Sequence, residues 1–174
     1  DTARVYGDSE HALGTALTEG WSSRATVITK LSPLDDCPAA ASSNVVKAFT
    51  ENSVYHSCYA LGVSKLDVLM LHRADHLKAW DGAVWSTVSQ LKELGVIGEL
   101  GVSAQTPEEA LLALEYQDVT FIQLPFNVLD YRWDTVADKV CRVRRYRHLV
   151  VHARSALLQG LLTTAQENLW KRAQ

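Results

Sequence analysis

The sequence is poor in the features that build disulfide frameworks, metal sites and membrane spans. Its 174 residues include three cysteines, Cys37, Cys58 and Cys141, which lie far apart and lack the close spacing of a zinc site. No apolar run approaches the roughly 20 residues that cross a bilayer, and no basic-then-apolar leader opens the chain. We therefore expect free thiols, no metal, no membrane segment and a cytoplasmic location.

A strong charge of either sign is missing as well. The net charge is -3 and the isoelectric point is about 6.1, which gives no basic footprint for nucleic acid or anionic lipid. With 47% hydrophobic and 21% charged residues, the composition is that of a globular protein. Because no internal repeat and no low-complexity linker interrupts it, we predict a single domain over residues 1–174. The chain also lacks an initiator Met, so we expect it to be trimmed at one or both ends.

Apolar runs of strand length alternate with amphipathic stretches of helix length, which is typical of a parallel sheet built from βα units. We expect strands within residues 25–30, 66–72, 97–103, 120–127 and 148–155. Counting the stub at Asp1, six strand ends follow in order. This predicts an incomplete (β/α)8 TIM barrel of about six units without its first and eighth strands. A doubly wound sheet is disfavoured because no G-x-G-x-x-G follows any strand.

Polar residues mark several of these strand ends. They are Asp1 and Tyr6 in the first turn, Lys30 and His72, and a barrel brings such positions to one mouth. Carbonyl reduction needs an acid beside the oxygen, and an ammonium group lowers the pKa of a nearby phenol. We therefore predict Tyr6 as the acid and Lys30 as its activating cation. Asp1 would hold Lys30 in place, and a neutral His72 would donate to the substrate oxygen.

Six motifs follow one another along the chain. DTARVYGDSE opens it, TK stands at residues 29–30, D-x-x-x-x-H at 67–72 and G-x-S at 101–103; Gln123 and SALLQGLL, beginning at Ser155, complete the series. In this order the motifs resemble the aldo-keto reductase superfamily over nearly all 174 residues. The resemblance implies an oxidoreductase that reduces an aldehyde or ketone, or oxidises the alcohol, by hydride transfer from a nicotinamide cofactor.

The same resemblance assigns residues to that cofactor. Ser103 and Gln123 would hold the nicotinamide carboxamide, Arg154 would stack where other members carry an aromatic ring, and the backbone near Ser155 and Leu157 would approach the pyrophosphate. NADP(H) is preferred because the family prefers it, while NAD(H) stays open. The partner is a small carbonyl or alcohol substrate, and missing segments or a second chain would complete the barrel.

One departure from the family pattern favours a different function. Ala104 stands where the family usually has Asn, and alanine cannot bond a carboxamide. The alternative is therefore a non-catalytic binding or regulatory protein on the same barrel, like the potassium-channel β subunits of this superfamily, or an inactive truncated fragment. Fold alone does not decide between these functions. The presence of all four catalytic residue types favours the enzyme.

Overall fold

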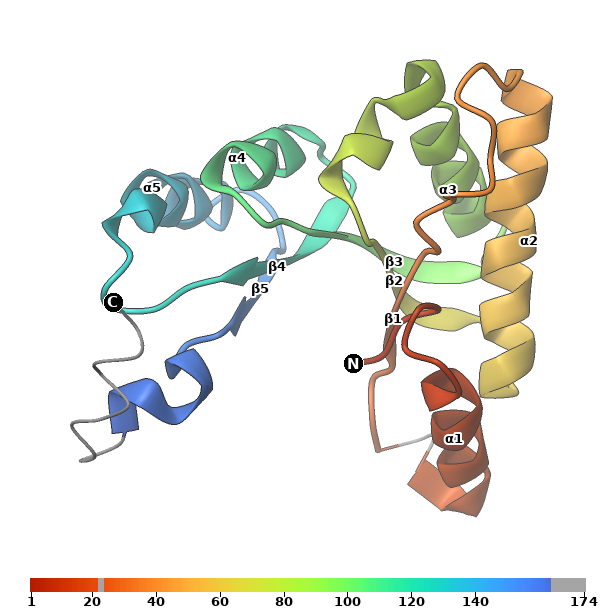
Figure 1. Cartoon of the computed structure of the whole chain (residues 1–174), viewed down its shortest axis with the longest axis horizontal. Coiled ribbons are helices and arrows are strands. Elements are labelled where there is room, and N and C mark those ends of the chain that lie inside the picture. Colours follow the sequence, from red (N-terminus) through yellow and green to blue (C-terminus); the bar gives the residue numbers. More distant parts are fainter. Residues whose placement is uncertain (22–23, 164–174) are drawn as a thin grey trace.

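A single parallel sheet organises the computed structural model, which describes residues 1–21 and 24–163 (Figure 1). The strands are β1 (Ile28–Lys30), β2 (Leu66–Leu71), β3 (Ile97–Ser103), β4 (Val119–Pro125) and β5 (Val150–Arg154). They pair in the order β1-β2-β3-β4-β5, and every pair is parallel. The α-helices are α1 (Ser9–Ala16), α2 (Ser43–Leu61), α3 (Ala83–Glu93), α4 (Pro107–Glu115) and α5 (Asp134–Val143).

Short helical turns complete the described elements. They are η1 (Leu17–Trp21), η2 (Ala74–Leu77), η3 (Ala79–Gly82), η4 (Tyr131–Trp133) and η5 (Leu158–Thr163). Helices and strands alternate along the chain, and α2 and α3 lie side by side (Figure 1). The fold is therefore an incomplete (β/α) barrel, as the sequence predicted.

The two faces of the sheet carry different apolar clusters. The large core lies between strands and helices and includes Leu69, Leu100 and Ile122. A small cluster of Ile28, Val68 and Met70, with Phe121 packed against it, forms separately. Burial on both faces explains why the strands are nearly continuous apolar runs in the sequence.

The N-terminal stub extends the sheet beyond β1 although it forms no regular strand. The Thr2 amide donates to the Ile28 carbonyl at 2.8 Å, and the Arg4 amide donates to the Lys30 carbonyl at 3.4 Å. These bonds place the first residues of the chain alongside β1. The sixth strand end predicted at Asp1 therefore corresponds to this hydrogen-bonded stub.

One helix begins later than the sequence pattern suggested. The apolar spacing of Val84, Val88 and Leu91 in the sequence predicts a helix from Trp80 to Leu94. In the structure α3 begins at Ala83 because Trp80, Asp81 and Gly82 all have positive φ angles. Such backbone angles cannot continue a right-handed helix. In the part of the chain that the structure describes, no helix is long and apolar enough to cross a membrane.

Candidate active site

The carboxyl ends of the strands bring the expected site residues to one edge of the sheet. Lys30 ends β1, His72 follows β2, Ser103 ends β3 and Arg154 ends β5. Gln123 of β4 is in register with Ser103. Because all pairs are parallel, these ends share one edge, which is where barrel enzymes place their chemistry.

An ion pair between Lys30 and Asp1 forms the centre of this edge. The Lys30 ammonium donates to one Asp1 carboxylate oxygen at 2.7 Å and to the Thr2 carbonyl at 3.3 Å. The Gln123 side-chain amide donates to the other Asp1 oxygen at 3.1 Å. Residues 122 positions apart in the sequence thus share one carboxylate.

The Lys30 ammonium is held in a costly environment. The residue is 1% exposed, and burial lowers its pKa from the ordinary value of 10.5. The neighbouring Tyr6 hydroxyl partly offsets this change, and the Arg154 guanidinium adds to the lowering. A buried cation with one carboxylate partner is unfavourable for stability alone, and such perturbed groups gather at functional sites.

Tyr6 and His72 complete the group around Lys30. The Lys30 nitrogen lies 5.3 Å from the centroid of the Tyr6 ring, and the Tyr6 and His72 ring centroids are 6.2 Å apart in an edge-on arrangement. Tyr6 is 51% exposed, so its ring is open to a ligand. Burial, then Lys30 and Arg73, lower the pKa of His72, whose Nδ1 has no partner among the described residues.

Ser103 and Gln123 offer a donor and acceptor set that fits a carboxamide. They are 3% and 8% exposed, and the adjacent Ala104 amide donates to the Gln123 carbonyl at 2.8 Å. A hydroxyl and a side-chain amide can together donate to and accept from a planar amide group. Ala104 itself is buried and adds no polar side chain.

The remaining residues expected at the cofactor lie on and after β5. The Arg154 guanidinium donates to the Ala104 carbonyl at 3.3 Å and to the Gln105 side chain, so it reaches across to the end of β3. Ser155 has a φ of 58°, and its carbonyl accepts from the Leu158 amide. Leu157 is exposed on the same turn. These two residues are near the mouth but are not drawn into the Lys30 cluster by the contacts described.

One buried residue beside the site was not singled out by the sequence. Glu10 of α1 is 2% exposed and accepts from the Thr29 hydroxyl at 2.6 Å and from Arg4 at 3.1 Å. Acidic residues are common in the first turn of a helix, so the residue type alone did not predict that Glu10 is buried. The available signal was its place as the last residue of the DTARVYGDSE motif.

Two loops after β1 and β2 are fastened to each other beside the site. Arg73 forms an ion pair with Asp35 at 2.9 Å, and the Trp80 indole donates to the Pro38 carbonyl at 2.9 Å. The loops follow Lys30 and His72 directly. The ion pair and the hydrogen bond therefore join the loop that follows Lys30 to the loop that follows His72.

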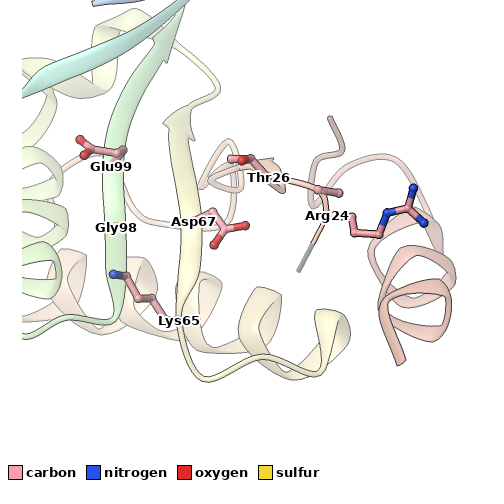
Figure 2. A pocket seen from close by; sticks show the side chains of 7 residues that line it. Arg24, Thr26, Lys65, Asp67, Gly98 and Glu99 are labelled. Atoms are coloured by element: carbon pink, nitrogen blue, oxygen red, sulfur yellow. The ribbon is translucent and has the colours of Figure 1, made fainter. Parts of the chain in front are cut away.

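A hollow at the amino ends of the strands does not form a second site of this kind. It is open to solvent, has a volume of about 570 Å³ and is lined by Arg24, Ala25, Thr26, Lys65, Asp67, Gly98 and Glu99. Figure 2 shows the charged ends of Arg24 and Glu99 pointing away from Asp67. The Asp67 carboxylate already accepts from the Val27 amide, and Glu99 already pairs with Lys92. The side chains therefore do not converge on one ligand.

Comparison with known proteins agrees with the fold and identifies the family. The sequence profile described as Aldo/keto reductase family matches residues 1–171. The chain therefore belongs to the aldo/keto reductase family. No curated protein sequence matches it.

Solved structures of aldo-keto reductases share the fold. A Bacillus halodurans enzyme in its holo form has a TM-score of 0.72 at 22% identity, covering 93% of this chain and 53% of its own. A Bombyx mori enzyme in complex with NADP has a TM-score of 0.63 at 19% identity, covering 89% and 50%. A candidate aldo-keto reductase from Pseudomonas aeruginosa has a TM-score of 0.68 at 25% identity, covering 87% and 58%. This chain thus spans 50–58% of the length of these structures.

Proposed function

We propose that this chain carries the catalytic centre of an oxidoreductase that reduces an aldehyde or ketone, or oxidises the corresponding alcohol, with a nicotinamide cofactor. The observation that carries the proposal is the cluster in which the buried Lys30 ammonium contacts Asp1 and lies beside the Tyr6 ring. Family membership supports the same class of reaction. Because the chain spans about half of its structural relatives, activity is proposed for the full-length protein.

In this proposal Tyr6 delivers the proton to the substrate oxygen during reduction. The Lys30 ammonium stabilises the negative charge that develops on the Tyr6 oxygen as the proton leaves. Asp1 keeps that ammonium in place through the 2.7 Å contact, and Gln123 in turn orients Asp1. The acid is therefore exposed to substrate while its activating cation is buried.

His72 orients the carbonyl in this reaction. Its pKa is lowered from 6.5, first by burial and then by Lys30, so the imidazole is neutral near neutral pH. A neutral imidazole can donate one N–H to the carbonyl oxygen without competing as an acid. Two donors, one from Tyr6 and one from His72, then polarise the same oxygen.

The cofactor would be held at the ends of β3, β4 and β5. Ser103 and Gln123 would bond the nicotinamide carboxamide, the flat face of Arg154 would lie against the ring, and the backbone at Ser155 and Leu157 would face the pyrophosphate. When bound, the cofactor supplies or accepts the hydride. NADP(H) is the preferred form, supported by the Bombyx mori complex, and NAD(H) remains the alternative.

Replacement of Tyr6 by Phe tests the proposal. The variant keeps the ring and loses the proton, so we expect turnover in the full-length protein to fall by about 10²- to 10⁴-fold. Nicotinamide fluorescence titration should show unchanged cofactor affinity. Tyr59→Phe, at a tyrosine exposed on α2, is the matched control.

The same experiment distinguishes the enzyme from a binding protein. Wild-type protein that binds the nicotinamide cofactor but turns over no carbonyl or alcohol substrate would favour the non-catalytic alternative. The buried Ala104, which offers no side-chain bond, is the feature that supports that reading. Turnover that survives in Tyr6→Phe would refute the assigned acid.

A further inference from the structure

The site is assembled from two segments whose backbone contact weakens toward the catalytic end. The hydrogen bond from the Thr2 amide nitrogen to the Ile28 carbonyl oxygen is 2.8 Å long. The next one, from the Arg4 amide nitrogen to the Lys30 carbonyl oxygen, is 3.4 Å long. Tyr6 lies beyond the second bond, and its amide turns back to the Ala3 carbonyl. Backbone pairing with β1 therefore does not reach Tyr6, and another contact must hold it near Lys30.

Glu10 joins the three pieces that meet here. One carboxylate oxygen accepts from the Thr29 hydroxyl at 2.6 Å, next to Lys30 in the sequence, and the other accepts from Arg4 at 3.1 Å, inside the turn that carries Tyr6. Glu10 itself lies in the first turn of α1. One side chain thus links β1, the turn and the helix.

A second link closes the same turn. The Thr2 and Ser9 hydroxyls lie 2.6 Å apart, joining the start of the stub to the start of α1. Glu10 is 2% exposed, and a buried carboxylate is costly unless its oxygens are bonded. Its two oxygens each have a partner, so this cost is compensated only when the turn is docked on β1.

We propose that Glu10 is a positioning residue that fixes Tyr6 against Lys30, acting through Thr29 and Arg4 without touching substrate. This inference rests on the proposed function, in which Tyr6 and Lys30 must be close during proton transfer. Small displacements of a reacting group have large effects on rate. Loss of the Glu10 contacts should therefore reduce turnover more than it reduces ligand binding.

Glu99 provides a matched control for the Glu10 variant. It also accepts from a threonine hydroxyl, that of Thr120 at 2.7 Å, and from a cation, Lys92 at 3.2 Å, but it lines the hollow at the amino ends of the strands. In the full-length protein we expect Glu10→Gln to lower kcat by about 10- to 100-fold with an unchanged cofactor Kd. Glu99→Gln should leave both values within about twofold.

A conservative pair at Thr29 separates positioning from general damage to the fold. Thr29→Ser keeps the hydroxyl that Glu10 accepts and should retain kcat, whereas Thr29→Val removes it and should reproduce the Glu10→Gln loss. Thermal unfolding of each variant shows whether it is folded. Equal losses of kcat in Thr29→Ser and Thr29→Val, or a normal kcat in Glu10→Gln, would overturn the proposal.

A readout that needs no activity separates this inference from the proposed function. Lys30 is buried beneath the turn, so its amine should resist reductive methylation with formaldehyde. We expect Glu10→Gln to increase the methylation rate of Lys30 by at least about tenfold relative to Glu99→Gln, measured by peptide mass spectrometry. Wild-type protein without turnover but with this labelling difference would refute the proposed function alone. Equal labelling in the two variants would refute the positioning role.

Discussion

Replacing Lys30 with Met should strongly reduce turnover and yet stabilise the fold. Methionine fills a similar buried volume without a charge, and Asp1 is exposed enough to stay solvated when its partner is removed. The Lys30 environment already disfavours its ammonium, since burial lowers its pKa despite the partial offset from Tyr6. Function and stability should therefore change in opposite directions.

The magnitude follows from the contacts of Lys30. The hydrogen bonds from Lys30 to Asp1 and to the Thr2 carbonyl stabilise the folded state by about 3–4 kcal/mol. Burial of the ion destabilises it by several kcal/mol. The net gain in the free energy of unfolding for Lys30→Met is then about 1 kcal/mol. This corresponds to a Tm higher by about 2–4 °C. Turnover should fall by about 10²-fold or more, because Tyr6 loses its activating cation.

The pH dependence of the stability difference has a fixed sign. The folded-state pKa of Lys30 lies below the ordinary 10.5, so between these two values the unfolded chain binds more protons than the folded chain. The unfolding free energy of the wild type therefore rises with pH across that window. The advantage of Lys30→Met should be largest below the window and shrink as pH approaches 10.5.

Urea unfolding of this chain across the pH range, together with a turnover assay of the same variant in the full-length protein, checks the prediction. Lys47→Met, at an exposed lysine of α2, is the control for removing a positive charge. A Lys30→Met variant that is less stable than the wild type at neutral pH would show that the Asp1 ion pair is a net stabilising contact. Full turnover in that variant would refute the role of Lys30.

Two further predictions concern the scaffold around the site. Gly14→Ala should destabilise the protein by about 1–2 kcal/mol despite the better helix propensity of alanine, because the added Cβ would lie 2.5 Å from the Ala60 carbonyl oxygen. Urea unfolding checks this, with Thr15→Ala at an exposed position of α1 as the control. A Gly14→Ala variant that is more stable than the wild type would contradict it. Burial and then Arg73 lower the pKa of the buried His76 from 6.5, so the free energy of unfolding should fall as pH drops below about 6.5. His76→Gln should make that fall less steep. An unchanged slope of unfolding free energy against pH in the variant would refute this.

The sheet and the positions of the main site residues could be predicted because they follow from one topological rule. Apolar runs marked the strands, and parallel strands with connecting helices place all carboxyl ends at one edge. Knowing only that Lys30 ends one such run and that His72 ends another was sufficient to group these two residues, whereas Gln123 was assigned through the family resemblance. The direct bond from Gln123 to Asp1 was not expected, because it depends on how the stub docks beside β1.

The contacts that support the site were less predictable, because the residues involved have ordinary alternatives. Glu10 lies in the first helical turn, where the helix dipole favours any acidic residue. An acid at this position therefore did not by itself predict that Glu10 is buried against Thr29. Trp80 was expected inside a helix, but its φ of 48° places it in a turn whose indole bonds Pro38 in another loop. Such long-range bonds override local propensity.

The electrostatics of the site connect its separate parts through the charge on Lys30. The buried ammonium that stands beside Tyr6 is also the second largest cause of the lowered pKa of His72. The same buried cation thus lies beside the Tyr6 ring and favours the neutral form of the imidazole. Proton transfer from Tyr6 and hydrogen bonding by a neutral His72 would then depend on the same ion. Because burial makes that ion unfavourable for the fold, its position at the mouth supports the proposed role of Lys30 in the chemistry.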